Sequence, residues 1–151
     1  MARRPPQDGP RIFSLDEANA LVPELQLELG RLATLRTEAA GLVEALGGGE
    51  EARAVLQGTD DPPLGDDHAV RLRALALEMT GVVDRIIGLG CLVKDLDTGL
   101  VDFLSLREGE PVFLCWQLGE PRITHWHTVE GGFAGRQPIE GAPARTVALP
   151  N

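Results

Sequence analysis

The segment from Leu114 to Ile139 holds both tryptophans, two of the three histidines and one of the two cysteines of the chain. His125 and His127 are two residues apart in a run that reads as a strand, so their side chains share one face. Two imidazoles in this arrangement can reach one divalent ion, zinc or iron. Candidate third ligands are Cys115 on the neighbouring strand, Glu120 at the turn and Glu130 beyond the strand. The alternative is a pair of half-exposed histidines, because a lone His-x-His is a weak signal.

A Gly-rich run, Gly131-Gly132-Phe133-Ala134-Gly135-Arg136, follows the histidines. Its backbone N–H groups and Arg136 could hold a small anion, together with Glu120, His127 and Trp116. It is not a P-loop, since the Lys-Ser/Thr ending is missing. The bland alternatives are a surface turn for the run and a core position for Trp116. The ligand itself stays open.

Three other forms of chemistry are disfavoured. The segment from Gly119 to Glu130 resembles the first cupin motif, but no histidine follows His127 for the second motif. A run Asp95-x-Asp97-x-Gly99-x-x-Asp102 lacks the later Glu of a calcium loop and is explained as a turn. Cys115 in an apolar run reads as an inert buried thiol, although a Cys–His nucleophile pair across adjacent strands is geometrically possible. No catalytic residue is assigned, and enzymatic activity stays uncertain.

Two long helices must precede this segment. Ser14-Leu15-Asp16-Glu17 forms a capping box, and a heptad seam then predicts a helix over 14–46 with a kink at Pro23. A second seam predicts a helix over 66–90, beginning at Asp66 or Asp67. The linker between them has room for one helical turn at 51–56. Spare apolar positions on both helices, such as Leu35, Leu42, Val83 and Ile87, predict contacts with the rest of the domain or with another subunit.

After Gly90 the periodicity changes to that of strands. Four strands are expected at 91–95, 100–105, 111–116 and 122–128, joined by short turns into an antiparallel meander over 91–128. Residues 129–151 read as a loop and tail. The fold class is therefore α+β, with a long antiparallel helical hairpin packed on a small antiparallel β-meander, and residues 1–151 form a single domain.

Composition limits the partners. The net charge of −9 disfavours nucleic acid, because the best basic patch is only Arg3, Arg4 and Arg11 in a Pro-rich start. No stretch reaches the roughly 18 consecutive apolar residues of a membrane span. Two distant cysteines and no secretory signal predict a cytoplasmic, reduced protein.

The chain also resembles the small uncharacterised prokaryotic family classed as domain of unknown function 2203. The residues that carry the resemblance cover most of the chain: 13–19, 93–95, 99–103, 114–116, Gly119-Glu120, Trp126-His127, Gly132-Phe133 and Gly135-Arg136. The resemblance implies no activity. It gives weight to His127, Glu120 and Arg136 and takes weight from His125.

Two function classes remain. In the first, the protein is a non-enzymatic binding or interaction module that forms a homodimer or higher homo-oligomer through its helices. In the second, the last strand and the Gly-rich loop bind a metal or a small anionic ligand, with hydrolytic chemistry as an option. The first is favoured here, because the sequence displays no complete ligand set.

Overall fold

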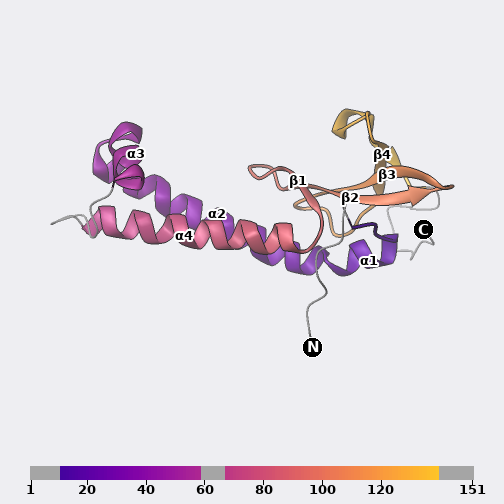
Figure 1. Cartoon of the computed structure of the whole chain (residues 1–151), viewed down its shortest axis with the longest axis horizontal. Coiled ribbons are helices and arrows are strands. Elements are labelled where there is room, and N and C mark those ends of the chain that lie inside the picture. Colours follow the sequence, from indigo (N-terminus) through magenta and orange to yellow (C-terminus); the bar gives the residue numbers. More distant parts are fainter. Residues whose placement is uncertain (1–10, 59–66, 140–151) are drawn as a thin grey trace. The chain divides into compact units, whose positions relative to one another are not determined.

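The computed structural model describes residues 11–58 and 67–139. Within these ranges helices occupy the N-terminal half and a five-stranded sheet the C-terminal half, which confirms the α+β class (Figure 1). The structure does not describe the basic N-terminal patch apart from Arg11, residues 59–65 of the linker, the predicted helix start at Asp66, or the tail beyond Ile139. The elements are α1 (Leu15–Ala20), α2 (Val22–Leu46), α3 (Gly49–Gln57), α4 (Asp67–Gly88), β1 (Leu92–Asp95), β2 (Leu100–Arg107), β3 (Glu110–Gln117), β4 (His125–Thr128), the 3₁₀ turn η1 (Phe133–Gly135) and β5 (Gln137–Pro138).

The contacts between residues in space divide the chain into two compact units. One is residues 27–85, and the other combines the preceding residues with those from 86 onward. The prediction of a single domain over 1–151 stays a prediction.

The first predicted helix is divided into α1 and α2. The capping box forms as expected, with the Glu17 N–H donating to Ser14 Oγ at 3.0 Å and the Ser14 N–H donating to Glu17 Oε1 at 2.8 Å. The expected kink is instead a break at Leu21, whose N–H turns back to the Ala18 carbonyl. Pro23 is the reason, since it has no N–H for the Asn19 carbonyl and its ring crowds that carbonyl.

In the unit of residues 27–85, α2 and α4 run antiparallel. Arg85 pairs with Glu28 and Arg71 pairs with Glu38, so residue numbers rise on one helix as they fall on the other. The predicted seams are buried at Leu29 and Leu32 of α2 and at Leu72, Leu75 and Val82 of α4. The spare position Leu35 is buried as well, with 7% of its surface exposed.

The single turn expected at 51–56 is part of a longer helix, α3. Gly47 and Gly48 end α2 with φ of 110° and 128°, a conformation that side-chain-bearing residues avoid. At the other end of α3, Arg73 Nε donates to the Val55 carbonyl at 2.8 Å and Nη2 to the Gly58 carbonyl at 3.1 Å. The guanidinium thus satisfies carbonyls that the end of a helix leaves without partners.

The sheet is antiparallel with the order β1-β2-β3-β4-β5, which confirms the meander and adds one strand. The last predicted strand begins three residues late, at His125. The residues expected at its start do not pair in the sheet, because the Ile123 N–H donates to Asn19 Oδ1 at 2.8 Å. The added strand β5 pairs Gln137 with Trp126 and Pro138 with His125.

One face of the sheet is apolar and is covered by the start of the chain. Phe13, just before α1, packs edge-on against Phe103 with ring centroids 5.1 Å apart. Its N–H donates to the Leu104 carbonyl at 2.8 Å, and its own carbonyl accepts from Ser105 Oγ at 2.6 Å. Val101, Phe103 and Trp116 are completely buried. The core of this unit therefore lies between α1 and one face of the sheet, and the opposite face is available for polar residues.

Candidate functional site

Three polar side chains meet on the other face of the sheet. Asp102 of β2 and Cys115 of β3 are direct partners in the ladder, and His127 of β4 completes the group. One carboxylate oxygen, the thiol sulfur and one ring nitrogen lie within 4.8 Å of one another. All three residues are buried, with 2%, 0% and 2% of their surfaces exposed. We call Asp102, Cys115 and His127 the polar cluster.

Strand alternation places the cluster. Asp102 lies between Val101 and Phe103, whose side chains point into the core against α1. Cys115 lies between Leu114 and Trp116 in the same way. Because successive side chains of a strand point to opposite faces, apolar neighbours on one face hold each polar residue on the other.

Both ring nitrogens of His127 are engaged. Nδ1 lies 2.7 Å from the Thr128 carbonyl oxygen, and Nε2 lies 2.9 Å from Asp102 Oδ2. A carbonyl can only accept, so Nδ1 carries a proton and donates it. The second contact therefore holds one proton between Nε2 and the carboxylate. No ring nitrogen remains to take a proton from Cys115, so this geometry does not form a Cys–His nucleophile pair.

The second carboxylate oxygen of Asp102 stands alone. Oδ1 is buried and has no hydrogen-bond partner among the described residues. Leaving a buried polar atom unsatisfied costs about 1–3 kcal/mol, and more for a charged group. Such an atom calls for an explanation, and a ligand that the cluster binds is one.

The Cys115 side chain is a thiol at neutral pH. Burial raises its pKa to about 11, the negative charge of Asp102 raises it further, and the guanidinium of Arg136 acts in the opposite direction. The sequence-based interpretation of Cys115 as an inert buried thiol agrees with this. A cation in the cluster would reverse the balance, because metal coordination deprotonates a thiol.

Arg136 and Glu120 border the cluster as a pair. Arg136 Nη2 donates to Glu120 Oε1 at 2.8 Å and Oε2 at 3.0 Å, and to the Cys115 carbonyl at 3.2 Å. Burial alone would lower the pKa of Arg136, but its hydrogen bond to Glu120 and the nearby Cys115 raise it. Arg136 Nε is buried and has no acceptor within the described part of the chain.

The Gly-rich loop positions this arginine. Gly132 has φ of 62°, and η1 then turns the chain so that the Arg136 guanidinium lies 4.8 Å from the Phe133 ring centroid. Glu120 is fixed from its own side, because its Oε1 also accepts from the Gln117 N–H at 2.7 Å. The loop thus fixes the position of the Arg136 guanidinium.

Of the five residues predicted as candidate metal ligands, the structure brings together two, Cys115 and His127. His125 lies opposite Cys115 in the ladder, but its Nδ1 is 2.9 Å from Thr124 Oγ1 and it is not part of the cluster. Glu130 is exposed and is not in the cluster either. Sequence reasoning missed Asp102 as a ligand. A carboxylate inside the apolar run Leu100–Leu104 was the available signal, since charged residues are rarely buried without a partner.

The predicted ligand pocket of Glu120, His127, Arg136 and Trp116 is divided between the two faces. Trp116 is completely buried in the apolar face, and its Nε1 donates to the Glu120 carbonyl at 2.8 Å. It therefore supports the turn that carries Glu120, and a ligand has no access to its ring in this conformation.

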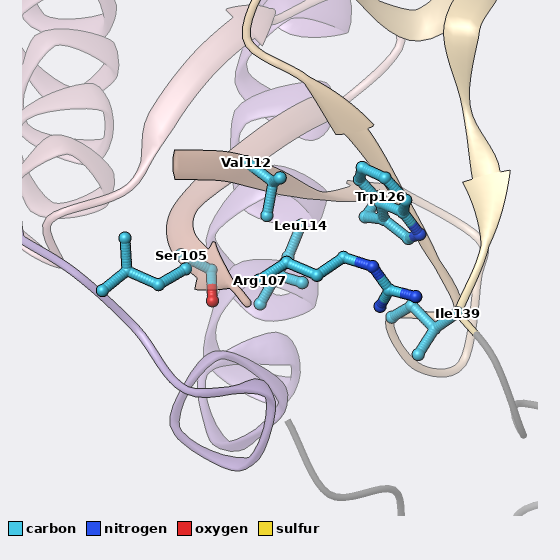
Figure 2. Close-up of a pocket in the computed structure, with 7 residues that line it drawn as sticks. Ser105, Arg107, Val112, Leu114, Trp126 and Ile139 are labelled. Atoms are coloured by element: carbon cyan, nitrogen blue, oxygen red, sulfur yellow. The ribbon is translucent and has the colours of Figure 1, made fainter. Parts of the chain in front are cut away.

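A pocket lies at the end of the apolar face, away from the cluster. Figure 2 shows Arg107 reaching across it toward Trp126 and Ile139. The Arg107 guanidinium carbon is 4.7 Å from the Trp126 ring centroid. The cavity volume of this pocket is about 30 Å³. A larger hollow of about 510 Å³ lies beside it and is bordered by Arg107, Trp126 and Glu130, and neither pocket includes a residue of the polar cluster.

Comparison with known proteins identifies a family. Residues 11–139 match the family described as Uncharacterized conserved protein (DUF2203), and the chain belongs to it. No curated protein and no solved structure matches the chain. None of the helices in residues 11–58 and 67–139 is long and apolar enough to cross a membrane.

Proposed function

We propose that this protein binds a divalent transition-metal ion, with zinc as the best fit, through Asp102, Cys115 and His127. The observation that carries the proposal is the convergence of three different donor atoms within 4.8 Å in a buried place, where Asp102 Oδ1 has no partner in the part of the chain that the structure describes. Thiolate, imidazole and carboxylate together suit zinc, and iron is the alternative.

The surroundings of His127 support this reading. Metal-binding histidines use one ring nitrogen for the ion and donate the other N–H to a carbonyl or carboxylate. Here Nδ1–H donates to the Thr128 carbonyl, so Nε2 is the nitrogen that faces the cluster. The ion would replace the proton shared by Nε2 and Asp102 Oδ2, and Oδ1 of the same carboxylate would coordinate the ion as well, which would give that oxygen its partner.

The geometry needs only a small adjustment. Zinc–ligand bonds of about 2.0–2.3 Å arranged tetrahedrally place the ligand atoms roughly 3.3–3.8 Å apart. Nε2 and Oδ2 now lie 2.9 Å apart and would separate slightly, while the largest spacing in the cluster, within 4.8 Å, would shrink. Rotation of the three side chains can supply both changes.

Titration of tag-free apo-protein with Co²⁺ tests the proposal. One equivalent of cobalt should produce a thiolate-to-cobalt charge-transfer band and the visible bands of a tetrahedral site, and Zn²⁺ should abolish them. Cys115→Ser should lose the charge-transfer band. Cys91→Ser is the matched control, because Cys91 is also a buried free cysteine whose pKa burial raises to about 11, but it lies outside the cluster. A wild-type protein that binds neither ion above background would refute metal binding.

A second candidate function is self-association through the helices, with a second copy of this chain as the partner. Two leucines favour it, since Leu27 of α2 is 60% exposed and Leu77 of α4 is 75% exposed. Large apolar side chains on otherwise charged helices mark interaction surfaces when they gather into a patch. The free thiols of Cys91 and Cys115 suit a cytoplasmic location for either function.

Light scattering tests self-association. The wild type should have the mass of a dimer or a larger oligomer at micromolar concentration, and Leu27→Glu with Leu77→Glu should give the monomer mass with an unchanged circular dichroism spectrum. Thr34→Glu, at an exposed position of α2, is the control for added charge. A monomeric wild type would exclude this function and leave metal binding unaffected.

A further inference from the structure

We infer that Arg136 holds a small anion, bound as the fourth ligand of the metal in the polar cluster. This inference rests on the proposed metal binding and assigns that site a ligand class. Three protein donors leave one position open on a four-coordinate ion. The question is which group near the cluster faces that position.

Arg136 is adjacent to the cluster. Its Nη2 donates to the Cys115 carbonyl at 3.2 Å, and its charge acts on the Cys115 thiol. Its Nε–H is buried and has no acceptor among the described residues. A donor in this position needs an acceptor, and neither a thiol nor a histidine N–H can serve as a good one.

Two atoms that lack partners in the described part of the chain belong to residues that both adjoin Cys115, and they are chemically complementary. Asp102 Oδ1 is a negatively charged acceptor, and a metal ion can satisfy it. Arg136 Nε–H is a positively charged donor, and an anion bound to that metal ion can satisfy it. A metal with an anionic fourth ligand satisfies both atoms together. A closed four-ligand structural site would satisfy only Asp102.

Glu120 holds the Arg136 side chain in place for this role and does not accept a hydrogen bond from its Nε–H. Both carboxylate oxygens of Glu120 accept from Nη2, so Nε is left available. Glu120 is itself anchored by the Gln117 N–H. Arg136 is therefore a fixed donor, which binds an anion without first having to become ordered.

Burial favours a small ligand, because each member of the cluster is at least 98% buried. Hydroxide meets this requirement, and so do linear anions such as azide. Azide would replace the water or hydroxide at this position, which would leave to solvent, with hydroxide taking up a proton from water as it leaves.

The experiment is an azide titration of the Co²⁺-loaded protein, followed by the visible cobalt bands. The wild type should show a saturable shift, and Arg136→Gln should bind azide at least tenfold more weakly while keeping its cobalt bands. Arg136→Lys keeps the charge but has no Nε–H at this position, so it should behave like Arg136→Gln. Arg53→Gln is the control, since it removes an equal charge from an exposed position in α3.

The outcomes separate the two claims. Absence of the thiolate-to-cobalt band in the wild type would refute metal binding itself. A normal band with no response of the wild type to azide would overturn the anion site and leave metal binding intact, whether or not any Arg136 variant folds. Azide affinity in Arg136→Lys equal to that of the wild type would overturn the role of the Nε–H.

Discussion

The two faces of the sheet are made by alternate residues of the same strands and have opposite characters. On one face Val101, Phe103 and Trp116 are packed against the start of the chain and leave little unsatisfied. On the other, the polar cluster is as deeply buried but contains a carboxylate oxygen that finds no partner within residues 11–58 and 67–139. Burial therefore stabilises the fold on the apolar face, whereas on the polar face it leaves an oxygen that a ligand can bind. Proteins commonly depart from complete polar satisfaction where they function.

Substitution of Phe103 by alanine should have the largest effect on stability. The ring is completely buried against Phe13, so its loss should lower the free energy of unfolding by about 3–5 kcal/mol. Urea denaturation measures this change. Cobalt affinity, measured without denaturant on the folded protein, should stay within about twofold of wild type if the faces are independent. A loss below 1 kcal/mol would contradict the assignment of the core to this face.

On the polar face, stability should depend on the pair of residues rather than on either one. Replacing only Asp102 or only His127 with leucine leaves the other polar group buried alone, which costs about 3 kcal/mol. The double variant Asp102→Leu with His127→Leu should lose at least 1 kcal/mol less than the sum of the single losses. Additive losses in this double-mutant cycle would mean that the two side chains do not interact as described.

Alkaline pH should weaken the apo-protein through its thiols. The pKa values of Cys91 and Cys115 are each raised from 9.0 to about 11, with burial as the main cause. The folded state thus favours the protonated thiols, so their contribution is complete below pH 9 and is lost as pH rises toward 11. The loss should reach up to about 2–3 kcal/mol for each thiol.

Zinc should change the alkaline loss of stability that comes from Cys115 and leave the loss that comes from Cys91 unchanged. Cys91→Ala and Cys115→Ala should each remove part of the alkaline loss in the apo-protein, as followed by chemical denaturation between pH 8 and pH 11. Zinc should remove only the part that depends on Cys115. An equal effect of zinc on the Cys91 part would place the metal elsewhere.

Replacement of Ser14 by alanine should have the smallest effect. It removes one half of the capping box of α1 and should cost about 1 kcal/mol. Because α1 contacts the apolar face, cobalt affinity should not change. Thermal denaturation and one cobalt titration suffice, and a clear weakening of cobalt binding would show that the faces are coupled.

The sequence predicted the fold well where the signals are local. The capping box at Ser14, the heptad seams and the turns between strands each depend on residues close together in the chain, and the α+β class follows from them. The start of the last strand was missed because Asn19, far away in sequence, takes the Ile123 N–H. The strand β5 has two residues, one of them a proline, and carries no periodic signal.

The candidate site was predictable only in part. Alternation placed His125 and His127 on one face, and Cys115 on the neighbouring strand was a correct candidate for proximity to His127. Asp102 could not be assigned to them, because its position depends on the β2–β3 register, which neither strand specifies alone. The role of Arg136 beside Cys115 depends on a loop conformation that only the folded chain reveals.

The position of Phe13 also has a consequence for synthesis on the ribosome. Its carbonyl accepts from Ser105, which is 92 residues further along the chain. At about 5–20 residues per second, the emerging chain waits roughly 5–18 seconds for this partner. During that interval Phe13 and the buried residues of α1, Leu15 and Ala18, are without the sheet that covers them in the folded protein.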